Sequence, residues 1–82
     1  MVEFVRCDHS ILSDIVNLAD IMKANFTNID ILYNNVGQVQ TDNPWKTSDG
    51  LNATITLNYL SHFLLTDQMY PMLNSTKGSR IV

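Results

Sequence analysis

Apolar residues change their spacing along the chain between short continuous runs and a repeat of three and four residues. Residues 2–6 and 29–33 are β-prone runs that end in polar residues, so we predict a strand at each of them. Between them, residues 11–26 fit one face of an amphipathic helix, with Ser10 as its N-cap. That face consists of Ile11, Leu12, Ile15, Leu18, Ala19, Met22 and Phe26.

The second half of the chain repeats this order after a polar segment. Residues 34–50 are rich in turn formers and predict a loop. Residues 50–73 then predict a second helix that is apolar around much of its circumference, which suits a helix packed between a sheet and a neighbour. Residues 80–82 begin a third strand after a turn. This order is typical of an α/β protein with a parallel sheet and helical crossovers, and it carries no function by itself.

Composition and charge exclude several classes of function. A chain of 82 residues forms at most one small domain. The net charge is −3 and the five basic residues are scattered, so we expect neither nucleic acid nor an anionic membrane as a partner. Cys7 is the single cysteine, which excludes an internal disulfide and a thiolate cluster, and we predict no metal site.

No segment of the sequence predicts a membrane span. The longest uncharged stretch is residues 50–66, and it is too polar for hydrocarbon because it carries Asn52, Asn58, Ser61 and His62. No signal-peptide pattern opens the chain. We therefore expect an intracellular, cytoplasmic protein, while a membrane anchor outside these residues stays open.

Polar residues follow the first two predicted strands, which is where an open parallel sheet binds its ligands. Asp8 comes after the first strand, and residues 34–37 (Asn-Asn-Val-Gly) come after the second. Together they could form one site for a polar ligand. The alternative is that Asp8 and Ser10 cap the next helix and that residues 34–37 turn the chain. Spacing alone favours this alternative.

Four segments, in their order and spacing, resemble the short-chain dehydrogenase/reductase family. Residues 34–37 resemble its Asn-Asn-Ala-Gly signature. Residues 47–51 (Thr-Ser-Asp-Gly-Leu) resemble the start of the next long helix in its retinol-dehydrogenase-like members. Residues 57–66 (Leu-Asn-Tyr-Leu-Ser-His-Phe-Leu-Leu-Thr) resemble its Val-Asn-His-Leu-Gly-His-Phe-Leu-Leu-Thr segment. Residues 80–82 resemble the start of the strand that follows.

The resemblance implies that residues 1–82 are an internal, incomplete part of an NAD(P)-binding Rossmann-type domain. The expected fold is a β-α-β-α-β fragment of a parallel sheet. The implied reaction is hydride transfer between NAD or NADP and a small-molecule alcohol or ketone. In the family's sheet, two strands separate the runs at 2–6 and 29–33. Here those runs must either pair directly or leave strand edges open, which favours aggregation.

The resemblance also implies a cofactor site. The Asp8 carboxylate would accept a hydrogen bond from the adenine amino group, and the backbone amide of His9 would serve the same site. Asn34 would lie along the adenosine ribose, with Asn35 in the same signature. Gly37 would let the backbone approach the cofactor because it has no Cβ.

Asn58 resembles the asparagine of the family's Asn-Ser-Tyr-Lys catalytic set. Its implied role is to hold, through its backbone and a water, the lysine that passes protons to the catalytic tyrosine. The alternative is a polar residue on a tolerant helix face. We expect His62, one turn later, to pack or bond locally rather than to act as an acid or base.

The rest of the family's machinery has no match in the chain. Gly37, Gly50 and Gly78 are too far apart to build the Gly-rich turn that binds a pyrophosphate. No tyrosine has a lysine four residues later, and the catalytic serine would follow Val82. We therefore expect the isolated chain to be inactive. A non-enzymatic interaction fragment and the relic of a broken gene are the alternative interpretations.

Overall fold

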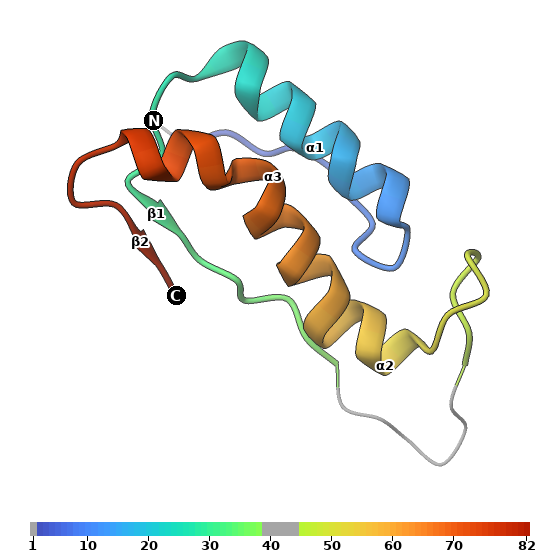
Figure 1. The fold of residues 1–82 in the computed structure, drawn as a ribbon. Coiled ribbons are helices and arrows are strands. Elements are labelled where there is room, and N and C mark those ends of the chain that lie inside the picture. The colour runs from blue at the N-terminus through green and yellow to red at the C-terminus, as the bar shows by residue number, and fades with distance from the viewer. Residues whose placement is uncertain (1, 39–44) are drawn as a thin grey trace.

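The computed structural model describes residues 2–38 and 45–82 and shows two long helices beside a small sheet (Figure 1). In chain order the elements are α1 (Leu12–Asn25), β1 (Ile31–Leu32), α2 (Ala53–Ile55), the π-helical turn η1 (Thr56–Leu60), α3 (Ser61–Ser75) and β2 (Arg80–Ile81). The elements α2, η1 and α3 follow one another without a break and form one continuous helix.

Strands β1 and β2 pair in parallel, and the continuous helix is part of the connection between them (Figure 1). Ile31 lies opposite Arg80, and Leu32 lies opposite Ile81. One further bond extends this pairing, because the Asn34 N–H donates to the Val82 carbonyl at 2.9 Å. Parallel pairing through a helical crossover confirms the α/β class predicted from the sequence.

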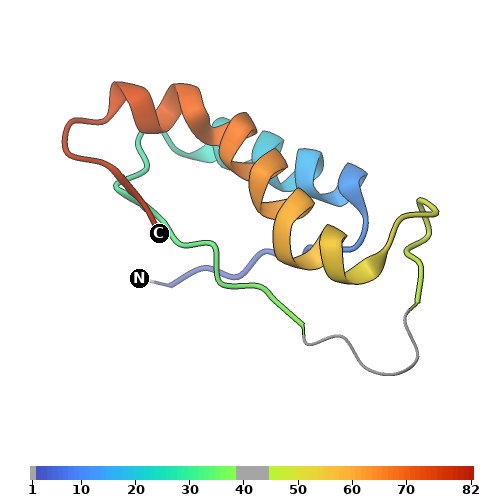
Figure 2. The same cartoon turned by 60° about the horizontal axis from the view of Figure 1, so that its bottom comes forward.

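Helices α1 and α3 lie side by side on one face of this sheet (Figure 2). Apolar residues at four-residue spacing share one face of a helix, so each helix turns a stripe inward. The buried core consists of Ile15, Ala19, Ile29, Leu65, Met69 and Leu73. Leu32 packs against this core, whereas its neighbours Ile31 and Tyr33 are 60% and 65% exposed. The sheet therefore has one covered face and one uncovered face.

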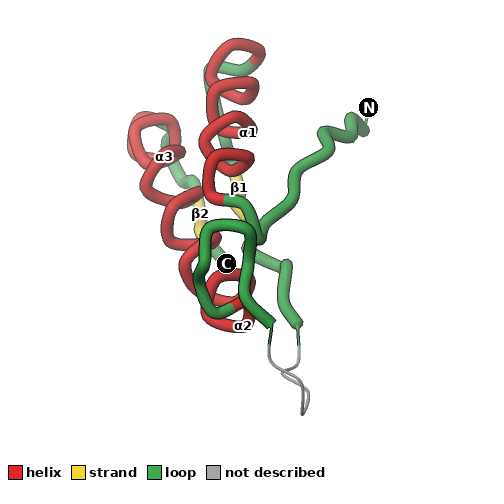
Figure 3. The backbone as a smooth tube through the Cα atoms, turned by 90° about the vertical axis from the view of Figure 1, so that its right-hand side faces the viewer, coloured by secondary structure: helices red, strands yellow, loops and turns green. Residues whose placement is uncertain are grey.

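Residues 2–6 do not form the predicted strand. They run away from the helices (Figure 3), and Val2 and Phe4 are 96% and 89% exposed. A hollow of about 360 Å³ lies between this segment and the end of α1, lined by Glu3, Val5, Met22 and Phe26. A strand forms only with a partner that completes its hydrogen bonds. Nothing within residues 2–38 and 45–82 pairs with this run, so a sheet edge is left open.

The helix boundaries agree with the predicted ones to within about three residues. Helix α1 begins and ends one residue inside the predicted 11–26. The second helix begins at Ala53 rather than at residue 50, because Asn52 caps it and its Oδ1 accepts from the Ile55 N–H at 3.0 Å. Gly50 has a φ of 78° in the turn just before this cap, where a residue with a Cβ would be strained.

The sequence predicted Ser10 as the N-cap of α1, and this prediction is wrong. The cap position is Ile11, and the Ser10 hydroxyl donates instead to Asp8 Oδ1 at 2.6 Å. The first turn of α1 is capped by a distant residue, because Asp49 Oδ2 accepts from the Leu12 N–H at 3.1 Å. A carboxylate is stabilised at the positive end of a helix. This bond therefore ties the loop before the second helix to the start of α1.

Three further observations concern membrane spans, metal sites and the cysteine. Among the helices that the structure describes, none is long and apolar enough to cross a membrane. The described part of the chain contains no group of three or more His, Cys, Asp or Glu side chains that could hold a metal ion. Cys7 is a free thiol that packs against the core, and its burial raises its pKa.

Candidate functional site

Three polar side chains line one face of the continuous helix and contact two earlier segments of the chain, the one after β1 and the one before α1. They are Asn58, His62 and Thr66, which follow one another at four-residue spacing and so share a face. Asn58 binds the backbone of Gln38, the His62 ring contacts the ring of His9, and Thr66 accepts from Asn34. This face is therefore where Asn34, Asn58 and His9 of the predicted site come together.

The Asn58 side chain holds the segment that follows β1. Its Oδ1 accepts from the Gln38 N–H at 2.7 Å, and its Nδ2 donates to the Gln38 carbonyl at 2.9 Å. One side-chain amide thus satisfies both backbone groups of Gln38, as a neighbouring strand would.

Gly37 lies against the same amide. A Cβ built on Gly37 would come within 3.1 Å of Asn58 Oδ1, which is closer than most real Cβ contacts. Of the glycines in the described chain, Gly50 and Gly78 have a positive φ and Gly37 does not. Gly37 is therefore not needed for a turn, and its missing Cβ makes room for the Asn58 side chain. The glycine at this position is therefore explained by its close approach to Asn58 and not by a left-handed turn.

Asn58 sits in the middle of η1, the π-helical turn. The Ser61 N–H donates to the Thr56 carbonyl, a bond across five residues instead of four. Thr56 and Ser61 are fully buried, and their hydroxyls donate to the carbonyls of Asn52 and Leu57, at 2.8 and 3.0 Å. Hydroxyl bonds to the carbonyl four residues earlier compete with helix bonds and often bend a helix. Short π-helical turns are common at functional sites.

Asn34 is fixed from two sides and keeps one group unpaired. Its backbone N–H bonds Val82, and its Nδ2 donates to Thr66 Oγ1 at 3.2 Å. The Asn34 Oδ1 is buried and has no hydrogen-bond partner among the described residues. An unpaired buried acceptor costs on the order of 1–3 kcal/mol. The Oδ1 atom is therefore the one polar atom of the Asn34 side chain that the described residues leave unsatisfied.

Asp8 and His9 form a corner at the start of α1. Asp8 Oδ1 accepts from both the backbone N–H and the hydroxyl of Ser10, and these bonds lower the pKa of Asp8 below its ordinary value. The Asp8 N–H donates to Asp14 Oδ2 at 3.2 Å. The exposed Asp8 carboxylate is therefore held in its ionised form and can accept further hydrogen bonds.

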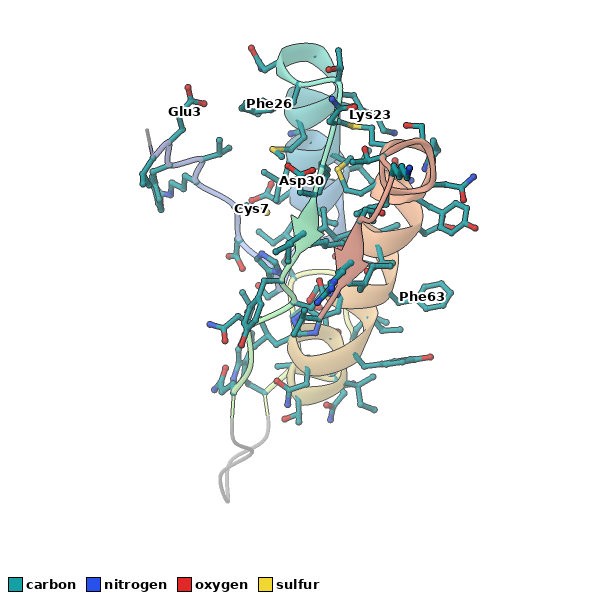
Figure 4. All side chains as sticks on the ribbon, turned by 90° about the vertical axis from the view of Figure 1, so that its left-hand side faces the viewer. Glu3, Cys7, Lys23, Phe26, Asp30 and Phe63 are labelled. Atoms are coloured by element: carbon teal, nitrogen blue, oxygen red, sulfur yellow. The ribbon has the colours of Figure 1, made fainter. Side chains whose placement is uncertain are left out.

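A hollow of about 380 Å³ borders the polar face of the helix. It is lined by Asn34, Asn58, Tyr59, His62, Phe63, Thr66, Asp67 and Tyr70. Its aromatic side chains are exposed, and Phe63 projects away from the helices (Figure 4). The rings of Tyr59 and Phe63 are in contact, with centroids 6.2 Å apart. The hollow thus has a polar side formed by the predicted residues and an apolar side formed by these rings.

The structure gathers some of the predicted residues and leaves others apart. Asn34, Gly37 and Asn58 lie together, and His9 joins them through His62. Asn35 is exposed and no hydrogen bond of its side chain is seen within the described chain. His62 packs against the distant His9, and the sequence analysis did not predict that His62 and Thr66 contact earlier parts of the chain. Asn58, His62 and Thr66 are polar residues spaced four apart on a largely apolar helix, and this pattern could have indicated a shared polar face.

A family model and individual relatives both match this chain to dehydrogenases. The family model described as short chain dehydrogenase matches residues 1–82. Human retinol dehydrogenase 14 is 44% identical over 55 residues, which cover 66% of this chain and 16% of that protein. Human polyprenol dehydrogenase is 33% identical over 75 residues, which cover 92% of this chain and 22% of that protein.

A solved structure matches the fold as well. It is the crystal structure of an uncharacterized protein from Mycobacterium paratuberculosis, with a TM-score of 0.73 and 32% identity. The match covers 88% of this chain and 25% of that chain. The chain thus spans less than a third of the length of the proteins that it matches here.

Proposed function

The chain belongs to the short-chain dehydrogenase family, and we propose that it forms the adenosine side and the Asn58 helix of an NAD(P)-dependent oxidoreductase. In this proposal residues 1–82 are one incomplete NAD(P)-binding unit. The substrate is a small-molecule alcohol or ketone. Relatives that are named for retinol and for polyprenol, both of them alcohols, support this substrate class.

The observation that carries the proposal is the convergence on Asn58, His62 and Thr66. The segment after β1 reaches this helix face through Asn34 and Gln38. In open α/β sheets, ligands bind beyond the carboxyl ends of the strands. The position of Asn34, Gly37 and Asn58 beyond the end of β1 supports this proposal.

The residues present suit the adenosine half of the cofactor. Asp8 offers an ionised, exposed carboxylate that can accept from an adenine amino group. Asn34 offers a buried, unpaired Oδ1 that can accept from a hydroxyl such as that of a ribose. The His9 N–H has no hydrogen bond to another described residue and can donate to a ring nitrogen.

The residues present do not suit the pyrophosphate. A pyrophosphate binds at a helix N-terminus, where free N–H groups face it. At the N-terminus of α1 the Asp49 carboxylate already accepts from the Leu12 N–H, and its negative charge would repel a phosphate. We therefore propose that the isolated chain binds nicotinamide cofactors too weakly to use them. A bound nicotinamide would supply or take up the hydride, and no residue of this chain replaces it.

Asn58 is a positioning residue in this proposal. Its side chain is committed to Gln38, so its backbone at η1 is the group left to support the lysine and water of the family's proton relay. No tyrosine of the chain has a lysine four residues later. We therefore propose that the chain alone turns over no alcohol or ketone.

Two experiments test the proposal. In the first, calorimetry with NADPH and NADH on the purified chain should give no measurable binding, and an alcohol oxidation assay should give no turnover. Micromolar binding would show that the anchoring contacts lie within these 82 residues.

In the second, residues 1–82 replace the matching region of human retinol dehydrogenase 14. The chimera should reduce or oxidise its substrate with NAD(P). A chimera that folds but stays inactive would instead favour the non-enzymatic alternative.

A further inference from the structure

The segment before α1 contacts the second helix through two histidine rings. His9 and His62 lie with their ring centroids 6.4 Å apart and their planes at 76°, an edge-to-face arrangement. These are the only two histidines of the chain. The contact joins residues that are far apart in sequence, and it brings the corner at Asp8 and His9 onto α3.

Each ring has a buried nitrogen without a partner. Neither His9 Nδ1 nor His62 Nε2 finds a hydrogen-bond partner in the described chain. A neutral imidazole can leave one nitrogen without a proton, whereas a protonated imidazole carries an N–H on both. Protonation would therefore put a charged, unpaired donor into a buried place, which is costly.

The charged groups around the two rings do not cancel this cost. Asp8 is the neighbour of His9, but it is exposed and already accepts two bonds from Ser10. Of the other charged groups nearby, Arg6 and Asp14 lie close to Asp8, and Asp67 lines the hollow beside His62. None of them bonds either buried nitrogen. Burial is the main cause that lowers the pKa of His9, and the nearby His62 lowers it further, while the charge of Asp8 acts in the opposite direction.

We propose that the His9–His62 contact is a pH-sensitive latch that holds residues 7–10 on α3 while the His9 ring is neutral. In the docked state protonation of His9 is disfavoured, and in the released segment the ring returns to the ordinary value near 6.5. The released state therefore binds more protons. Docking is at full strength above that ordinary value and weakens as the pH falls below it.

A histidine titration by NMR tests the latch on the 82-residue chain itself. The ring resonances of His9 and His62 are followed from pH 8 to pH 4, together with hydrogen exchange of the bonded amides of Ser10 and Ile11. The His9 ring should titrate below its ordinary value. Exchange protection, corrected for intrinsic rates, should fall by up to roughly tenfold per pH unit for each proton taken up. A His9 ring that titrates at or above the ordinary value would overturn the latch.

Two variants separate the latch from other effects of acid. His9→Leu and His62→Leu each introduce an apolar side chain of similar reach and remove one of the two imidazole rings. In His9→Leu the protection of residues 10 and 11 should lose its dependence on pH between 7 and 5, whereas in His62→Leu the dependence should persist in weakened form, because burial still acts on His9. Persistence of the full dependence in His9→Leu would show that another group controls the segment. If a variant unfolds, the titration of the unmodified chain still decides.

Discussion

The side chain of Asn58 forms two hydrogen bonds to the backbone of Gln38, at 2.7 and 2.9 Å, twenty residues earlier in the chain. This pairing fastens the segment after β1 to the π-helical turn. It also explains the glycine at position 37, because a Cβ there would lie 3.1 Å from Asn58 Oδ1. Gly37 and Asn58, which belong to two separate family motifs, thus lie against each other in the structure.

A double-mutant cycle should reveal this dependence. Asn58→Ala removes two hydrogen bonds and should lower the free energy of unfolding by about 1–3 kcal/mol. Gly37→Ala should also destabilise, because its new methyl group meets Asn58 Oδ1. In the Asn58→Ala background that obstacle is gone, so Gly37→Ala should cost much less. Urea unfolding of the four chains measures the coupling, and strictly additive losses would contradict it.

A matched control is available on the same helix. Asn74 is an exposed asparagine near the end of α3, and its side chain holds no other segment. Asn74→Ala should change the unfolding free energy by less than about 0.5 kcal/mol. An equal loss from Asn74→Ala and Asn58→Ala would show that helix propensity alone explains the effect.

The Asp49 cap on α1 should contribute measurably to stability. Asp49→Ala removes the acceptor for the Leu12 N–H and should cost about 0.5–2 kcal/mol, as for other lost caps. Asp49→Asn retains an acceptor and should cost less. Far-UV circular dichroism during urea unfolding gives both values. If Asp49→Ala were as stable as the unchanged protein, the long-range cap would not persist in solution.

The pKa of Asp8 should depend on Ser10. The hydroxyl and the backbone N–H of Ser10 bond the Asp8 carboxylate and lower its pKa, the hydroxyl being the larger cause. A lowered folded-state pKa means that this contribution to stability is present above the unfolded value and is lost as the pH falls through the folded one. Ser10→Ala should therefore move the Asp8 pKa upward, toward its ordinary value. Carboxyl titration by NMR measures the shift, and an unmoved pKa would contradict the assignment.

The sequence predicts the helices of this chain better than its strands. The spacing of Ile15 and Ala19 is local information, and it suffices to place α1 to within one residue at each end. Residues 2–6 have the composition of a strand, yet strand formation depends on a partner that local sequence does not reveal. Ser10 is not the cap because the helix begins one residue later than the sequence predicted, with Ile11 at the cap position.

Several residues of the candidate site could be predicted from the sequence, but the contacts between them could not. The motif at residues 34–37 and Asn58 indicated one site by their resemblance to a family. Nothing in the spacing of Gln38 and Asn58 predicts that they bond, because twenty residues and a loop separate them. The His9–His62 contact likewise follows from the way the segment before α1 meets α3, which only the three-dimensional structure gives.

Asn58 and Asp8 should affect different kinetic constants in the active chimera with retinol dehydrogenase 14. Asn58 is proposed to support the proton relay, whereas Asp8 is proposed to contact the adenine. Positioned proton transfer contributes typically 10²–10⁴-fold, so Asn58→Ala should lower kcat by roughly tenfold to a hundredfold and change the cofactor KM little. Asp8→Ala should raise the cofactor KM through the loss of one charge-assisted hydrogen bond of about 1.5–3 kcal/mol, with kcat nearly unchanged.

Steady-state kinetics at saturating substrate separate the two effects. Asp8→Asn is the matched control for charge, since it keeps the size of the side chain and an acceptor oxygen, and its effect on the cofactor KM should lie between those of aspartate and alanine. Because the Asn58 side chain also holds Gln38, the stability of each variant is measured beside its kinetics. If Asn58→Ala and Asp8→Ala both raised the cofactor KM equally while kcat stayed intact, Asn58 would be a structural clamp only. Its proposed part in the proton relay would then be wrong.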